Sequence, residues 1–267
     1  MKKSISIFCF VFSLLFVFYS CKKDKNPPPD MGYNYFPNIV GEYVVYDVDS
    51  IYYNSANINS NTHKASDTTY LFQIKEKVQS IYLDNQNRPT MRLERYVKYH
   101  NDTIPYSNMQ WTIRNVWAEN RTPTTAEKVE ENIRYVKLAF PVTGTQNWNG
   151  NAQNTLNPWT YNYAYFDKPA SIGSTHSDST LQVTQFDDGG GILTQRQLYI
   201  EIYARNIGMV YKQVIDIGSQ PASSWNLLSQ QAYTDSATAF YAIPILQRIN
   251  SGTQYSMTLN SYGIEYP

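Results

Sequence analysis

The stretch Tyr70-Leu71-Phe72-Gln73-Ile74-Lys75 shows the pattern that decides the fold. Its first, third and fifth side chains are aromatic or aliphatic, and they alternate with Leu71, Gln73 and Lys75. Alternate side chains point to opposite faces of a strand, so we expect the first set on the core face and the second set in water. One buried face and one solvated face are typical of antiparallel sheet.

The same period of two recurs along the chain. The side chains expected on the core face are Met91, Leu93, Val97 and Tyr99 in one segment and Met109, Trp111, Ile113 and Trp117 in the next. Later strands are expected at Arg134–Phe140, Ser179–Phe186, Thr194–Tyr203, Met209–Ile217 and Gln254–Tyr266. We therefore predict an all-β or β-dominated fold, in which a large antiparallel sheet curls into a barrel, half-barrel or sandwich, with at most one or two short helices.

Short polar segments at 84–87, 130–132 and 187–191 indicate turns between these strands. The last of them is Asp187-Asp188-Gly189-Gly190-Gly191, whose two carboxylates fall short of the roughly six to eight oxygens that Ca²⁺ takes, so we interpret it as a turn. Ile243-Pro244 indicates an edge strand or a break, because Pro cannot donate to a ladder. The segment Ser223–Tyr233 fits a helix capped by Ser223 or Ser224, with an ordered loop as the alternative.

The first residues have the parts of a secretory signal peptide. A basic start, Met1-Lys2-Lys3, precedes the apolar run from Ile5 to Tyr19, which closes on Phe18-Tyr19-Ser20-Cys21. A small residue followed by Cys resembles the lipobox of bacterial lipoproteins. That resemblance implies cleavage before Cys21, acyl chains on Cys21 and a membrane tether. The alternatives are an uncleaved anchor, which needs about 20 apolar residues, and an ordinary secretory signal that leaves a lone thiol.

The predicted organisation is a signal peptide at 1–20, a lipidated Cys and Pro-rich linker at 21–32, and a single β-rich domain at 33–267. Pro27-Pro28-Pro29 stays extended and is typical of a short stalk. The segment of about a dozen residues that begins at Tyr35-Phe36-Pro37 resembles the opening of secreted bacterial β-proteins. That resemblance implies only that the folded domain begins here. We expect a protein that is anchored by lipid in the cell envelope, at the outer membrane, and it could face either the periplasm or the cell surface.

Composition excludes several classes of function. Cys9 lies inside the expected signal and Cys21 is the expected lipidation site, so no thiol remains for a disulfide, a Cys-based zinc site or a Cys nucleophile. The chain has 22 basic and 22 acidic residues, and loss of Lys2 and Lys3 leaves 20 against 22. A net charge near −2 does not indicate the excess of basic residues that is typical of proteins that bind nucleic acid.

No residue pattern predicts catalysis, a metal or a cofactor. His63, His100 and His176 stand in polar surroundings, and we interpret them as surface residues. The run His176-Ser177-Asp178-Ser179 has the residue types of a serine hydrolase, but neighbours in a strand point to opposite faces and do not form a triad. We therefore predict a protein that is not an enzyme, and we assign no catalytic residue.

The candidate ligand-binding residues are aromatic side chains at and after the longest expected loop, Thr145–Trp159. They are Trp148, Trp159, Tyr161, Tyr163 and Tyr165, and Asn and Gln residues flank them. Such rings can stack on sugars, although aromatics near loops most often pack against the sheet, which is the interpretation we favour.

Three functions follow, in order of preference. The first is a non-enzymatic carrier or binding module that holds an apolar or amphipathic small molecule inside the curled sheet. The second is a surface module for a glycan or an unidentified protein partner, which would use the Trp148–Phe166 region. A hydrolase is a distant third.

Overall fold

The computed structural model describes residues 29–59, 64–221 and 229–266. The chain divides into Met1–Asp30 and Met31–Pro267, and only Pro29 and Asp30 of the first unit are described. The expected signal peptide, the expected lipidation site Cys21, His63 and the serines expected to cap a helix at 223 and 224 lie outside the described residues.

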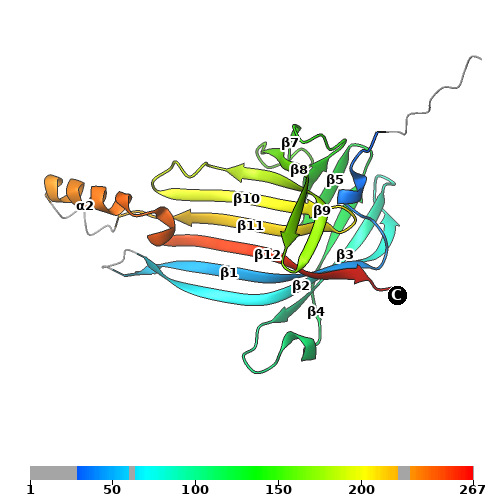
Figure 1. Ribbon diagram of the computed structural model, residues 1–267, viewed down its shortest axis with the longest axis horizontal. Helices are drawn as coiled ribbons and strands as arrows, with labels where there is room; N and C mark the ends of the chain where they lie inside the picture. The colour runs from blue at the N-terminus through cyan, green and yellow to red at the C-terminus, as the bar shows by residue number, and fades with distance from the viewer. Residues whose placement is uncertain (1–28, 60–63, 222–228, 267) are drawn as a thin grey trace, which may run out of the picture. The chain divides into compact units, whose positions relative to one another are not determined.

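The second unit is built on one sheet of 12 strands, all antiparallel (Figure 1). Its strands are β1 (Glu42–Ile58), β2 (Ala65–Leu83), β3 (Pro89–Tyr99), β4 (Thr112–Arg121), β5 (Thr125–Glu130), β6 (Ile133–Ala139), β7 (Asn147–Asn149), β8 (Thr160–Ile172), β9 (Thr175–Asp187), β10 (Gln195–Ala204), β11 (Gly208–Gly218) and β12 (Ser251–Ile264). The predicted fold class is confirmed, and the sheet is nearly closed into a barrel. The five later strands expected from the sequence match β6, β9, β10, β11 and β12 to within a few residues.

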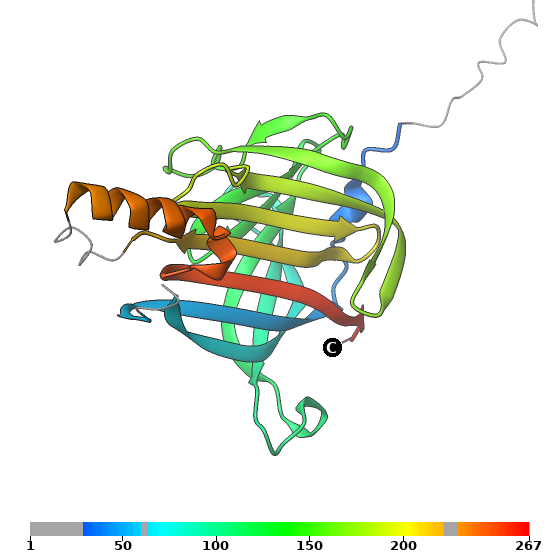
Figure 2. The same ribbon diagram turned by 60° about the vertical axis from the view of Figure 1, so that its left-hand side comes forward.

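Strands that follow one another in the sequence are neighbours in the sheet, except β6 and β7. The first strand, β1, pairs with the last, β12, so that Val48 lies opposite Met257. The two edges of the sheet are therefore β6 and β7, in the middle of the chain. In Figure 2 the green strands cross behind the yellow and red ones, so the sheet wraps around an interior.

Side chains close the seam between β6 and the β7–β8 hairpin. The indole Nε1 of Trp148 donates to the carbonyl oxygen of Val136 (2.9 Å), and the amide of Val136 donates to the carbonyl of Gly150 (2.9 Å). The hydroxyl of Tyr163 accepts from the Ala139 amide (2.9 Å) and donates to the Ala139 carbonyl (2.8 Å). Backbone groups of Val136 and Ala139 on the β6 edge are thus paired, which removes part of the hazard of an exposed edge.

The burial of β2 corrects one expectation. Phe72 and Ile74 are buried as predicted, but Tyr70 is 56% exposed. Gln73 and Lys75, which were expected in water, are buried. Both have polar partners on neighbouring segments: the Gln73 amide donates to Asp47 on β1, and the Lys75 ammonium pairs with Glu265, which follows β12. A cross-strand partner lets a polar side chain lose its water without leaving a charge or donor unpaired.

The expected core faces of β3 and β4 are correct only in part. Tyr99 and Ile113 are exposed, although Met91, Leu93 and Val97 are buried. The cause for Ile113 is a register shift: Arg95 pairs with Asn115, while the next residue of β3 pairs with Ile113. The extra residue on β4 between Ile113 and Asn115 reverses the face on which the side chains beyond it lie.

Among the described residues there is one α-helix, α2 (Gln230–Ala242), besides three short 3₁₀ turns, η2 (Tyr33–Tyr35), η3 (Tyr106–Asn108) and η5 (Ile245–Gln247). The predicted end of the helix at Tyr233 is wrong, since α2 continues to Ala242 and buries Phe240. Its N-cap is Ser229, whose hydroxyl accepts from the Ala232 amide. Ile243-Pro244 ends the helix, so the predicted break is confirmed. No helix in the described part of the chain is long and apolar enough to span a bilayer.

Candidate functional site

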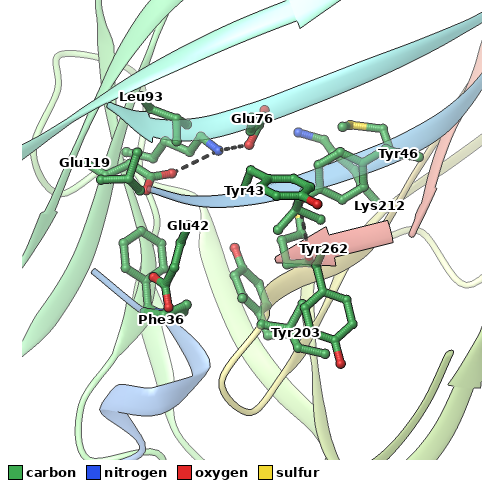
Figure 3. Close-up of a pocket in the computed structure, with 18 of the residues that line it drawn as sticks. Phe36, Glu42, Tyr43, Tyr46, Glu76, Leu93, Glu119, Tyr203, Lys212 and Tyr262 are labelled. Atoms are coloured by element: carbon green, nitrogen blue, oxygen red, sulfur yellow. Dashed lines mark hydrogen bonds and ion pairs between the residues drawn. The ribbon is translucent and has the colours of Figure 1, made fainter. Parts of the chain in front are cut away.

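A cavity of about 260 Å³ lies inside the sheet. Part of its wall is aromatic or aliphatic and includes Phe36, Leu93 and Tyr203 (Figure 3). Two further lining residues, Tyr262 and Ile264, are 48% and 47% exposed. The cavity therefore reaches the surface beside the end of β12, where that strand pairs with the beginning of β1.

The remainder of the wall is charged. Besides Glu42 at the start of β1, eight charged side chains from seven other strands line the cavity: Glu76, Arg95, Glu119, Lys128, Glu130, Lys137, Glu201 and Lys212. Three of the opposite-charge pairs stand directly across from each other in the sheet register: Glu76 and Arg95, Glu119 and Lys128, and Glu201 and Lys212. Cross-strand neighbours lie on the same face, so the antiparallel register itself brings these charges together.

The Glu76 cluster comprises Glu76, Arg95, Glu119 and Lys128. The two carboxylate oxygens of Glu76 contact Arg95 Nε (2.8 Å) and Lys128 Nζ (2.8 Å). Lys128 also contacts Glu119 Oε1 (3.0 Å), and Figure 3 shows the two glutamates linked through this one ammonium group. The Arg95 guanidinium stacks 3.6 Å from the ring centroid of Trp117, which holds its plane against the wall.

The Glu201 cluster comprises Glu130, Lys137, Glu201 and Lys212. Lys137 Nζ lies 2.8 Å from Glu130 Oε1 and 3.0 Å from Glu201 Oε1. Lys212 Nζ lies 3.2 Å from the same Glu201 oxygen. The hydroxyl of Tyr203 donates to the other oxygen of Glu201 (2.8 Å). Both Glu201 oxygens are therefore occupied inside the barrel.

The surroundings of these glutamates move their pKa values in different directions. Burial alone would raise the pKa of Glu76, but Lys128 and Arg95 outweigh it and the pKa lies below the ordinary 4.5. Lys137 and Lys212 likewise outweigh burial and lower the pKa values of Glu130 and Glu201. Glu119 differs: burial raises its pKa, and Lys128, which it shares with Glu76, offsets this only in part.

Stability is a weak reason for so many ionised groups inside a barrel. Two charges removed from water lose hydration that their mutual attraction regains only in good geometry, and apolar replacements are often as stable or more so. Perturbed ionisable groups gathered at a cavity are instead characteristic of functional sites. Charged groups and aromatic rings thus line one and the same cavity.

The candidate residues expected from the sequence lie elsewhere. Tyr161 and Tyr163 are buried in the core, Trp148 and Trp159 are half-buried and pack against it, and Tyr165 is 73% exposed. All five are described, and none is among the residues that line the cavity. Trp148 and Tyr163 hydrogen-bond across the seam, and the Trp159 ring meets Tyr199 edge-on, with centroids 5.3 Å apart. Ligand binding by these residues stays a prediction, and packing accounts for four of them.

The His176 region holds a contact that adjacency in the sequence did not suggest. Ser171 Oγ lies 3.2 Å from His176 Nδ1, and Asp178 Oδ1 lies 3.3 Å from His176 Nε2. His176 and Asp178 are exposed on the β8–β9 hairpin, where water competes for both contacts. A hydrolytic triad holds its histidine with a sheltered acid, so this arrangement gives no support to hydrolysis. Among the described residues no group of three or more His, Cys, Asp or Glu is placed to hold a metal ion.

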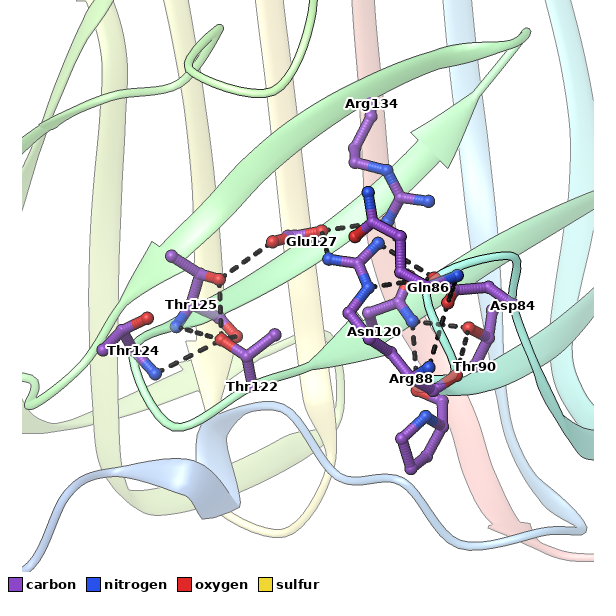
Figure 4. Close-up of polar contacts among 11 residues, drawn as sticks. Asp84, Gln86, Arg88, Thr90, Asn120, Thr122, Thr124, Thr125, Glu127 and Arg134 are labelled. Atoms are coloured by element: carbon purple, nitrogen blue, oxygen red, sulfur yellow. Dashed lines mark hydrogen bonds and ion pairs between the residues drawn. The ribbon is translucent and has the colours of Figure 1, made fainter.

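Two other polar groupings have structural partners. Asp187 and Asp188 accept hydrogen bonds from glycine amides of the turn and pair with Arg196, which confirms the turn interpretation. On the face of β4 and β5 opposite the Glu76 cluster, Glu127 pairs with Arg88 and Arg134 (Figure 4). This grouping fastens the β2–β3 turn to the sheet.

Sequence reasoning missed all nine charged residues of the cavity wall. A signal was present for some of them: Glu76 follows Ile74 and precedes Val78, and Arg95 stands between Leu93 and Val97, at spacings of two. A charge at a position where alternation demands an apolar side chain indicates either a break in the pattern or a buried partner. No protein-family model, curated protein or solved structure matches the chain, so the site is interpreted from its own geometry.

Proposed function

We propose that the protein is a non-enzymatic binding protein that holds one small amphipathic molecule in the barrel cavity. The observation that supports this most is a cavity with aromatic and aliphatic side chains on part of its wall and charged side chains on the rest. Small-molecule sites are concave, mostly apolar and oriented by a few polar groups. A volume of about 260 Å³ has room for roughly nine waters at about 30 Å³ each, or an organic molecule of roughly ten non-hydrogen atoms.

The test uses 2-phenylethanol as a neutral amphipathic probe and follows binding by calorimetry. Val44 is half-buried and lines the cavity, so Val44→Phe puts a ring into the space. Val116 is 39% exposed and lies outside the cavity wall, so Val116→Phe is the matched control. We expect saturable binding at one site in the unaltered protein and in Val116→Phe, and at least a tenfold loss in Val44→Phe. Absence of binding, or binding that Val44→Phe leaves unchanged, would contradict the proposal.

The proposal includes a lipid anchor at Cys21, supported by the lipobox-like Ser20-Cys21 junction after the apolar run. Each buried methylene of an acyl chain contributes about 0.8 kcal/mol, so two or more chains give lasting attachment at the cell envelope. Cys21→Ala should move the protein from the membrane fraction to the soluble fraction, whereas Cys9→Ala should not. Full membrane retention of Cys21→Ala would rule the anchor out.

A further inference from the structure

We infer that the molecule held in the cavity carries a cationic nitrogen and that Glu119 pairs with it. The inference rests on the proposed function and names the chemistry of its ligand. Its first support is the charge of the wall. Glu42 lines the cavity in addition to the eight residues above, so the wall holds five carboxylates and four basic groups. With all of them ionised, the wall has one negative charge in excess.

The basic groups of the wall are already matched. Arg95 and Lys128 each contact Glu76, and Lys137 and Lys212 each contact Glu201. An anionic ligand would have to compete with these carboxylates for its partners, at short range and with little water to screen the repulsion. A carboxylate or phosphate group is therefore a poor match for this wall.

Two acids of the wall lack a base of their own. Glu119 is 8% exposed, and its only ion pair within the described residues joins Oε1 to Lys128, which also serves Glu76. In Figure 3 its other oxygen turns toward the side of the cavity where Glu42 and Phe36 lie. Glu42 accepts a hydrogen bond from the Ile39 amide (2.9 Å), and the described residues give it no ion pair.

The two acids belong to the same part of the barrel. Arg121 follows Glu119 by two residues on β4 and donates to the carbonyl oxygen of Phe36 (3.0 Å), which lines the cavity six residues before Glu42. Burial raises the pKa of Glu42, and the positive charge of Arg121 offsets this only in part. An ammonium or guanidinium group has donors and no acceptors, and a carboxylate has acceptors only, so the two are complementary. The apolar part of such a ligand would lie against Phe36 and Leu93.

The experiment compares three probes of matched shape: 2-phenylethylammonium, 2-phenylethanol and phenylacetate. We expect the ammonium probe to bind at least tenfold tighter than the alcohol, and phenylacetate to bind weakest. Glu119→Gln keeps the shape of the side chain and removes the charge. It should abolish the preference for the ammonium probe while leaving the affinity for the alcohol unchanged. Glu94→Gln is the control, because Glu94 is an acid on β3 that pairs with Arg92 and does not line the cavity.

A second measurement needs no variant. The carboxyl ¹³C resonance of Glu119 reports its titration in the unaltered protein, where Lys128, Glu76 and Glu130 are the charged groups that act on it. Saturation with 2-phenylethylammonium should lower this pKa, because a bound cation favours the carboxylate. The inference would be overturned if phenylacetate bound tighter than the ammonium probe, if Glu119→Gln kept the preference for the ammonium probe, or if the pKa of Glu119 did not move. In each of these cases, binding of 2-phenylethanol would still support the proposed function. Failure of all three probes would overturn both.

Discussion

Tyr163→Phe tests how the barrel is closed. The hydroxyl accepts from the amide of Ala139 at 2.9 Å and donates to its carbonyl at 2.8 Å, so one side chain replaces both ladder bonds of an edge residue. Tyr163 is 4% exposed and Ala139 is 6% exposed, so water does not readily substitute for the lost hydroxyl. A buried donor or acceptor left without a partner costs about 1–3 kcal/mol. With two such groups and the ring packing retained, we expect the free energy of unfolding to fall by about 2–6 kcal/mol.

Urea unfolding at equilibrium gives this difference in the free energy of unfolding. Tyr165→Phe is the control, because Tyr165 stands two residues further on in β8 and is 73% exposed. Its loss should stay within about 0.5 kcal/mol, as is usual for surface changes. Hydrogen exchange at the Ala139 amide should also become faster in Tyr163→Phe. Equal effects of the two substitutions, or unchanged exchange at Ala139, would refute this account of the seam.

Glu201→Gln should destabilise the protein by about 3–5 kcal/mol in urea unfolding, because it leaves Lys212 without its closest carboxylate inside the barrel; a change under about 1 kcal/mol would argue against the pairing. Glu76→Gln should cost more than Glu119→Gln in the same assay, since Glu76 contacts two bases and Glu119 shares one, and the reverse order would be inconsistent with the geometry. The folded-state pKa values of Glu76, Glu130 and Glu201 lie below the ordinary 4.5. Their contribution to stability is therefore complete above about pH 4.5 and is lost as the pH falls through the folded-state values. A thermal unfolding midpoint that does not fall in acid would contradict this. Arg248→Lys should lower the free energy of unfolding by about 2–4 kcal/mol. The buried guanidinium donates to the carbonyls of Ile243 and Leu193 and to the hydroxyl of Ser219. An almost unchanged stability would show that a single ammonium group can replace these hydrogen bonds.

The alternation in segments such as 70–75 was sufficient to predict a large antiparallel sheet, because a period of two depends only on local backbone geometry. It was insufficient at β4, where a register shift opposite Arg95 puts Ile113 outside. A bulge is set by how two strands pair, and a single strand carries little trace of it. The expectation that polar positions face water failed at Lys75 for a related reason, since its partner Glu265 is 190 residues away.

The site was harder to predict than the fold. Trp148 and Tyr163 were candidate ligand-binding residues because they are aromatic and lie near a loop. The seam that they close exists only because β1 pairs with β12, which leaves β6 and β7 as the edges of the sheet. The charged side chains of the cavity wall come from eight strands. Glu76 and Arg95 are 19 residues apart and become neighbours through the hairpin register. A charge in the apolar register was visible in the sequence, but its partner was not.

Occupancy of the cavity by a small molecule is best tested at the methionine methyl groups. Met209 and Met257 line the cavity, whereas Met91 is buried outside its wall and Met109 is half-exposed on the segment before β4. During titration with 2-phenylethanol we expect the ¹³C-methyl resonances of Met209 and Met257 to shift together and saturate, while those of Met91 and Met109 stay in place. Unmoved Met209 and Met257 resonances at saturating probe, or shifts confined to Met109, would contradict a binding site inside the barrel.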